Sequence, residues 1–145
     1  MRLGRDVQGI EGLPMVLLLG VIFGACAFGL GVKCLTQAQN TIDKQQAIES
    51  FNAFVEQAHA ACMGSVGNAR QVELKLSGGR MLIHDRLVQL VMDNESLKTE
   101  ILPLPVLSES GGELRDGNYL LELKRATREN GTLHVNDYYI GLRRL

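Results

Sequence analysis

The feature that most constrains this chain is the uncharged apolar run of residues 13–32, close to its start. As a helix this run would be roughly 30 Å long, which matches the hydrocarbon core of a bilayer. We therefore expect it to enter a membrane at some stage. Arg2 and Arg5 precede the run, whereas Lys33 and Lys44 beyond it are mixed with acidic residues. Because basic residues favour the cytoplasmic side, the N-terminus is predicted to be cytoplasmic and the bulk of the chain to lie outside.

The start of the predicted helix is marked by Gly12 and Pro14, since proline is tolerated in the first turn of a helix. We expect the helix to begin at Leu13 or Pro14. Inside it, small residues recur at steps of four, three and four, which places them on one face. They are Gly20, Gly24, Ala27 and Gly31. Glycine is common in membrane helices for no specific reason, but a continuing stripe favours close packing of another helix.

Beyond Lys33 the helical pattern continues without a break but becomes amphipathic. Its apolar positions are mostly three and four residues apart: Leu35, Ala38, Ile42, Ile48, Phe51, Val55, Ala58 and Cys62. Gly64, Gly67 and Asn68 then supply a stop signal, so the helix should end near Cys62. We expect this stripe, from Leu35 to Cys62, to lie on one face of a sheet.

The tail of the chain changes to the period of β-strands. Val72 and Leu74 alternate with charged residues, and Asn130-Gly131 is a strong hairpin signal. The expected strands are 72–76, 80–92 with a break near Asp85, 97–102, 119–126 and 132–142; residues 108–118 are expected to form a polar loop. The tail should therefore be an antiparallel meander of about five or six strands, a number within the usual range for a sheet.

The predicted fold is α+β: a long N-terminal helix, membrane-spanning and then amphipathic, packed at its C-terminal half on an antiparallel β-meander. The segments expected are a cytoplasmic leader (1–9), a transmembrane or filament-core helix (10–32), an amphipathic helix (33–68) and a β-rich extracellular head (69–145). A helix of this length cannot be covered by one small domain. Its N-terminal half needs lipid or neighbouring copies.

Composition and motifs argue against catalysis. The chain has 15 basic and 16 acidic residues and no basic cluster with interleaved aromatic residues, so no nucleic-acid surface is expected. His59, His84 and His134 have no partner at metal-ligand spacing. No phosphate-binding loop, nucleophile elbow or zinc-protease motif occurs. We expect neither an enzyme nor a cofactor or metal.

Three cysteines, Cys26, Cys34 and Cys62, fall in the predicted helix. On one straight helix Cys34 and Cys62 would lie roughly 42 Å apart, far beyond the reach of a disulfide. Cys26 and Cys34 fit as small residues compatible with a membrane. Cys62 is interpreted as a buried free thiol, with pairing between subunits as the alternative.

Glu11 is the carboxylate nearest the apolar run. Burying a lone carboxylate is costly, so inside a helix bundle it would need a cation or a position near the lipid headgroups. A simpler interpretation is that Glu11 favours the positive N-terminal end of the helix.

Two acceptor triplets for N-glycosylation occur in the tail, Asn94-Glu95-Ser96 and Asn130-Gly131-Thr132. Both fall in predicted hairpin turns on the side expected to be outside the cell. Asn94 and Asn130 are therefore candidate glycosylation sites.

The segment Gly9-Ile10-Glu11-Gly12-Leu13-Pro14, with the apolar run after it, resembles the N-terminus of archaeal type IV pilin-like proteins that carry class III signal peptides. The resemblance implies cleavage by a prepilin peptidase between Gly9 and Ile10, and extraction by a membrane platform with an assembly ATPase into a filament of related subunits. It also implies that Glu11 neutralises the amino terminus of a neighbour, while Gly20, Gly24, Ala27 and Gly31 pack in the filament core with Pro14.

The sequence thus supports a structural filament subunit at the cell surface, of major, minor or secretion-pseudopilus type. The alternative is a single-pass membrane-anchored binding protein whose β-rich ectodomain does not polymerise. A flexible Ser/Gly/Pro-rich stalk would favour the anchored protein, and the region after the apolar run contains none. A third interpretation is a cleaved secretory signal peptide with Ala25-Cys26-Ala27 as its exit, although the apolar run is long for that role and the helical pattern continues past the cut.

Overall fold

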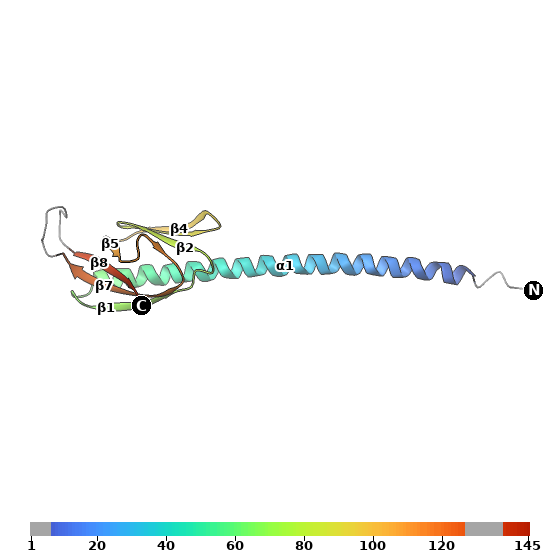
Figure 1. Ribbon diagram of the computed structural model, residues 1–145, viewed down its shortest axis with the longest axis horizontal. Coiled ribbons are helices and arrows are strands. Elements are labelled where there is room, and N and C mark those ends of the chain that lie inside the picture. Colours follow the sequence, from blue (N-terminus) through green and yellow to red (C-terminus); the bar gives the residue numbers. More distant parts are fainter. Residues whose placement is uncertain (1–6, 127–137) are drawn as a thin grey trace, which may run out of the picture. The chain divides into compact units, whose positions relative to one another are not determined.

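The structure is a computed structural model that describes the backbone of residues 7–126 and 138–145 and the side chains of residues 14–126 and 138–145. It divides into two compact units, Met1–Thr41 and Ile42–Leu145, each taken by itself below. In the first unit all the described structure is helical. The described residues of the second unit form the end of the same helix, α1 (Val7–Cys62), and eight strands (Figure 1).

Helix α1 ends at Cys62, as the stop signal predicted, but it begins at Val7 and not at Leu13 or Pro14. Pro14 therefore lies inside the helix. The φ angle of proline suits a helix, but proline inside a helix lacks one N–H donor and its ring crowds the carbonyl four residues earlier, so the helical turn before Pro14 forms at a cost in free energy. After Cys62 the chain turns at Gly67, whose φ of 87° favours glycine.

The strands form two four-stranded sheets. Their bounds are β1 (Ala69–Leu74), β2 (Arg80–His84), β3 (Leu87–Met92), β4 (Glu95–Ile101), β5 (Val106–Ser108), β6 (Glu113–Leu114), β7 (Gly117–Arg125) and β8 (Tyr138–Arg144). Sheet A has the order β1-β7-β8-β5 and sheet B the order β4-β3-β2-β6. All neighbours are antiparallel except β5 and β8, which are parallel.

The α+β class and the helix-on-sheet arrangement are confirmed, but the single meander of five or six strands is wrong. After β4 the chain crosses to sheet A to form β5, returns to sheet B for β6, and then continues into β7 of sheet A. Strands β5 and β6 have three and two residues, and together with the start of β7 they occupy much of the stretch expected to be a polar loop. Strands this short carry no readable period.

The hairpin turns of the second unit fall where the sequence placed them. Asp85 joins β2 to β3 with a φ of 56°. Between β3 and β4, Asp93 and Asn94 have φ angles of 53° and 62°, and two successive positive values characterise the type I′ hairpin turn. Strands β7 and β8 pair as predicted, with Arg125 opposite Tyr138. The turn predicted at residues 128–131 lies outside the described residues.

The core of the second unit lies between the end of α1 and the inner faces of both sheets. The helix contributes residues at steps of four, three, four and three, which form one stripe. They are Ala47, Phe51, Phe54, Ala58 and Ala61. Val72, Leu74 and Leu76 are buried against this core, as their alternation predicted. Ile48, Val55 and Cys62 are partly buried beside it.

The apolar stripe predicted from Leu35 to Cys62 is only partly correct. Leu35, in the first unit, is 70% exposed, and Ile42, in the second, is 63% exposed. Ile42 precedes Phe51 by nine residues, which is about two and a half helical turns, so the two side chains leave the helix in opposite directions. Ile42 therefore cannot reach the core that Phe51 fills.

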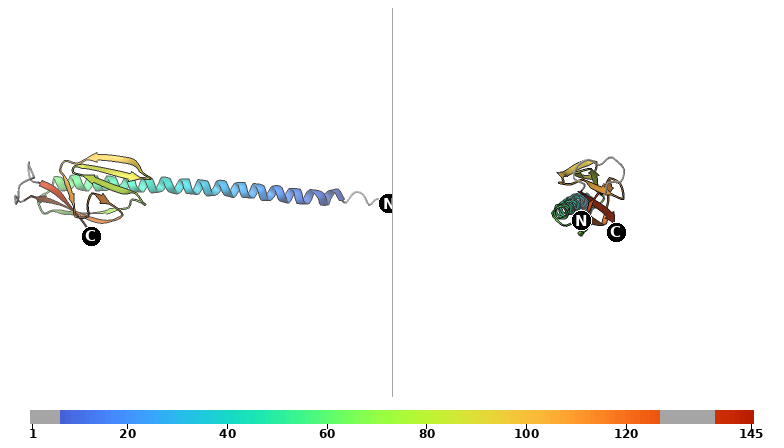
Figure 2. Two further views of the ribbon diagram at one scale, coloured as in Figure 1. Left: turned by 45° about the horizontal axis from the view of Figure 1, so that its top comes forward. Right: turned by 90° about the vertical axis from the view of Figure 1, so that its left-hand side faces the viewer.

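The second-unit part of α1 contacts an edge strand of each sheet (Figure 2). The Ser50 hydroxyl bonds to the backbone N–H and C=O of Lys75, just after β1, at 3.2 Å each. On the other side the Lys98 ammonium of β4 donates a hydrogen bond to Asn52. These hydrogen bonds link the helix to the end of β1 and to β4.

Candidate membrane and self-association surface

The described side chains of the first unit, residues 14–41, are all exposed. The helix from Pro14 is long and apolar enough to cross a membrane: its most apolar window of 18 residues has a mean hydropathy of 2.5, and none of that window is buried. A signal sequence would meet the same criteria of length and composition. Large apolar side chains gather here: Met15, Val16, Leu17, Leu18, Leu19, Val21, Ile22, Phe23, Phe28, Leu30 and Val32. Such a surface requires lipid or protein to cover it.

The small residues of this helix leave open space around them. A side chain built at Gly20, Gly24 or Gly31 would meet no atom within 4 Å. Nothing in the described chain therefore requires glycine at these positions. A second helix packed closely against them would require it.

The stripe of small residues extends further than the sequence interpretation took it. After Gly31, steps of three, four and three reach Cys34, Ala38 and Thr41. A repeat of three and four residues is the spacing of a helix–helix seam. We call the residues Gly20, Gly24, Ala27, Gly31, Cys34, Ala38 and Thr41 the small-residue stripe. It continues past the apolar run into the polar part of the first unit.

The predicted processing site lies at the start of α1. The backbone of Gly9, Ile10 and Glu11 is helical, and their side chains lie outside the described part of the chain. Pro14 is exposed. Neither the cleavage nor the charge pairing implied for Glu11 is tested by this geometry, and both stay predictions.

Of the two candidate glycosylation sites, only Asn94 lies in the described part of the chain. Asn94 is exposed in the β3–β4 turn. Asn130 lies outside the described residues. His134 lies there too, whereas His59 is half-buried on α1 and His84 is exposed on β2. Within the described ranges no group of three or more His, Cys, Asp or Glu side chains could hold a metal ion.

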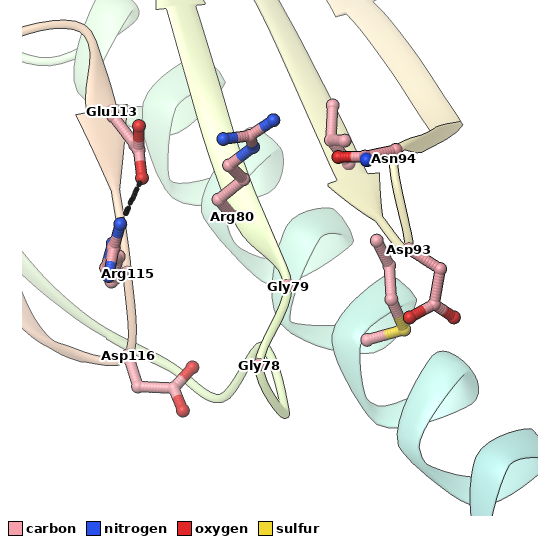
Figure 3. A pocket seen from close by; sticks show the side chains of 10 residues that line it. Gly78, Gly79, Arg80, Asp93, Asn94, Glu113, Arg115 and Asp116 are labelled. Carbon is pink, nitrogen blue, oxygen red and sulfur yellow. Dashed lines mark hydrogen bonds and ion pairs between the residues drawn. The ribbon is translucent and has the colours of Figure 1, made fainter.

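A polar hollow of about 710 Å³ opens on the second unit (Figure 3), and the sequence interpretation missed it. It is formed by the turn after β1, the β3–β4 turn and the segment around β6: Gly78, Gly79, Arg80, Val91, Met92, Asp93, Asn94, Glu113, Arg115 and Asp116. Arg115 pairs with Glu113 at 2.9 Å, and Asp93 lies 3.9 Å from Lys44. One oxygen of Asp116 accepts a hydrogen bond from the Leu76 N–H at 2.5 Å. The charged side chains that line the polar hollow are thus of both signs.

A second, less polar hollow of about 510 Å³ lies at the end of α1. Its lining comes from the helix end, the β4–β5 connection and sheet A: Cys62, Gly64, Ser65, Val66, Pro103, Leu104, Leu123 and Tyr138. The three cysteines are free thiols. Burial raises the pKa of the Cys62 thiol above its ordinary value, so Cys62 stays neutral and weakly reactive at physiological pH. Cys62 is thus a free thiol, as interpreted from the sequence, but it is only partly buried.

Comparison with protein-family models, with curated proteins and with solved structures finds no match to this chain.

Proposed function

We propose that this protein is a structural subunit of a surface filament of the type IV pilin kind, assembled through the helix of its first unit. The observation that supports the proposal is the small-residue stripe on a fully exposed, membrane-length helix. Lipid can cover apolar side chains, but it gives no reason for a row of residues without bulk. Another helix at close range does.

The chain would first be inserted as a single-pass membrane protein, with its N-terminus in the cytoplasm and the second unit outside. Its partners would be copies of itself or related subunits, a prepilin peptidase and an assembly platform with its ATPase. The second unit would form the outer surface of the filament. Neither an active site nor a cofactor is part of this role.

The deciding experiment is N-terminal sequencing of the native protein, together with electron microscopy of sheared surface material. Cleavage before Ile10 and a filament that contains this chain are the expected results. Replacing Gly9 by a bulky residue should then leave the protein in the membrane, because the peptidase must accommodate a small residue there. Residues 1–9 found intact in assembled filaments would contradict the proposal.

The alternative, an anchored binding protein, draws support from the apolar hollow beside Cys62, which could receive a partner. The two functions give different results in the same experiment. An anchored binder keeps its N-terminal residues, stays in the membrane fraction and forms no filament.

A further inference from the structure

Asn94 combines two independent features. It is the acceptor residue of the triplet Asn94-Glu95-Ser96, and its side chain lines the polar hollow of the second unit. The tight β3–β4 turn fixes its position, with positive φ angles at both Asp93 and Asn94. An exposed asparagine in a turn is the geometry in which N-linked saccharides are attached.

Two glycines, Gly78 and Gly79, line the hollow beside Val91 and Met92. Gly78 has a φ of 86°, which side chains rarely permit, and a Cβ at Gly79 would come within 2.9 Å of the Leu76 carbonyl oxygen and 3.1 Å of the Val91 carbonyl oxygen. Both positions are therefore restricted to glycine by the backbone. The hollow has a volume of about 710 Å³, within the size range of sites that hold small molecules.

The walls of the hollow suit sugar hydroxyl groups, which both donate and accept hydrogen bonds. Arg80 offers N–H donors, while Arg115 and Glu113 are paired with each other. The carboxylates of Asp93 and Asp116 each have one partner, Lys44 and the Leu76 N–H, and keep further acceptor positions. Arg80 forms no ion pair with any described residue, so its donors are available. Figure 3 shows these groups arranged around the same hollow as Asn94.

We propose that Asn94 carries an N-linked saccharide whose first sugars occupy this hollow. In the transfer, the amide nitrogen of Asn94 bonds to the anomeric carbon of a saccharide carried on a lipid phosphate. The bond from that carbon to the phosphate oxygen breaks, the phosphate departs with its electron pair, and the amide loses one proton. The donor is the lipid-carried saccharide in the membrane, and a membrane glycosyltransferase on the outer side supplies the catalysis.

This inference rests on the proposed placement of the second unit outside the cell, yet the glycosylation and filament proposals can each fail without the other. A chain cut before Ile10 whose Asn94 is unmodified would keep the filament proposal and end this one. A modified Asn94 in a chain that forms no filament would do the reverse.

The first test is mass spectrometry of the native protein, with the peptide that contains Asn94 as the target. We expect it to carry a saccharide, and we expect the saccharide to disappear in Asn94→Gln and Ser96→Ala but to remain in Ser96→Thr, which keeps the triplet. Asn52→Gln is the matched control, because Asn52 is exposed but is followed by Ala53-Phe54 and forms no triplet. An unmodified Asn94 in the wild type overturns the proposal.

The second test asks whether the hollow holds the sugars. Release of the saccharide by a glycan amidase should become roughly tenfold faster in Arg80→Ala, as expected for the loss of one hydrogen bond to a charged group. Arg143→Ala, an exposed arginine on β8 away from the hollow, should not change the rate. Equal rates in the wild type and Arg80→Ala would show that the saccharide projects into solvent, which contradicts the seating.

Discussion

At the scale of single residues, positions on the same helix α1 have different surroundings. Phe51 is completely buried, with the Lys98 ammonium 5.9 Å from the centre of its ring, whereas Ile42 is mostly exposed. In the first unit, Cys34 lies on the small-residue stripe and Cys26 does not, because Cys26 follows Gly24 by two residues and leaves the helix on the opposite side. Ile42 is therefore a control for substitutions of Phe51, and Cys26 is a control for those of Cys34.

Replacing Phe51 by alanine should lower the free energy of unfolding of the second unit by about 3–5 kcal/mol, because a buried ring is lost and a cavity remains. Small domains have only about 5–15 kcal/mol of stability in total, so the melting temperature should fall clearly. Ile42→Ala should change the stability by less than about 0.5 kcal/mol. Circular dichroism melts measure both, and an unchanged midpoint for Phe51→Ala would place this ring outside the core.

The small-residue stripe predicts which native thiol meets its own copy. Mild oxidation of the full chain in its membrane should join two chains through Cys34 and not through Cys26. Cys26→Ser should preserve the disulfide-linked dimer on a non-reducing gel, and Cys34→Ser should remove it. Dimers that form equally through either thiol would indicate random collision, and the stripe would then not be the contact.

At the scale of elements, the first-unit helix has two kinds of residue with different roles: bulky apolar side chains and the glycines of the small-residue stripe. The bulky apolar side chains suit a nonpolar environment whichever direction they point. The glycines on the small-residue stripe have no neighbour within 4 Å and become meaningful only when another helix approaches. Gly29 is equally open but lies off the stripe, so it distinguishes the two roles.

We expect Gly24→Leu to impair assembly, because a branched side chain would keep two helices apart at a close contact. Gly29→Leu adds the same bulk on another face and should assemble normally. The melting temperature of the second unit should be unchanged in both variants. Filament yield by electron microscopy tests this, and normal filaments from Gly24→Leu would make the stripe incidental.

The elements that the sequence predicted well are those with a sustained period. The alternation around Val72 and Leu74 placed β1, and the glycines after Cys62 placed the end of α1. Strands β5 and β6 are too short for a period and are held by pairing with β8 and β2. Spacings of three and four residues also continue across both faces of α1, which is why Leu35 and Ile42 were wrongly joined to the buried stripe.

Some of the candidate sites could likewise be predicted from the sequence and others could not. Positions such as Gly24 and Asn94 could be singled out from local sequence, because a packing stripe and an acceptor triplet are local patterns. The polar hollow could not, because Gly79, Asp93 and Glu113 come from separate turns that only the two-sheet topology brings together.

At the scale of the whole molecule, the hydrophobic core described above consists entirely of residues of the second unit. The first helical residue in that core is Ala47, and every other member lies further along the chain. None of the described side chains before Ala47 belongs to it. Folding of the second unit should therefore need neither lipid nor neighbouring copies.

A fragment that begins at Lys33 should be soluble, monomeric and folded, with the same melting temperature as the second unit of the full chain in detergent. A matched fragment that begins at Met63 should not fold, because it lacks the helical residues Phe51 and Phe54 that fill the core. Analytical ultracentrifugation and thermal melts measure the outcome. Aggregation of the longer fragment would mean that the boundary between the units lies earlier.

The position of β8 inside sheet A has a consequence for the order of folding during synthesis. This strand is the last along the chain, yet it lies between β7 and β5 and buries Ile140 and Leu142. Until residues 138–144 leave the ribosome or translocation channel, β5 has no partner in sheet A and β7 has a partner on only one side. Sheet A can therefore be completed only after residues 138–144 have emerged, whereas all the strands of sheet B have emerged once Leu114 has.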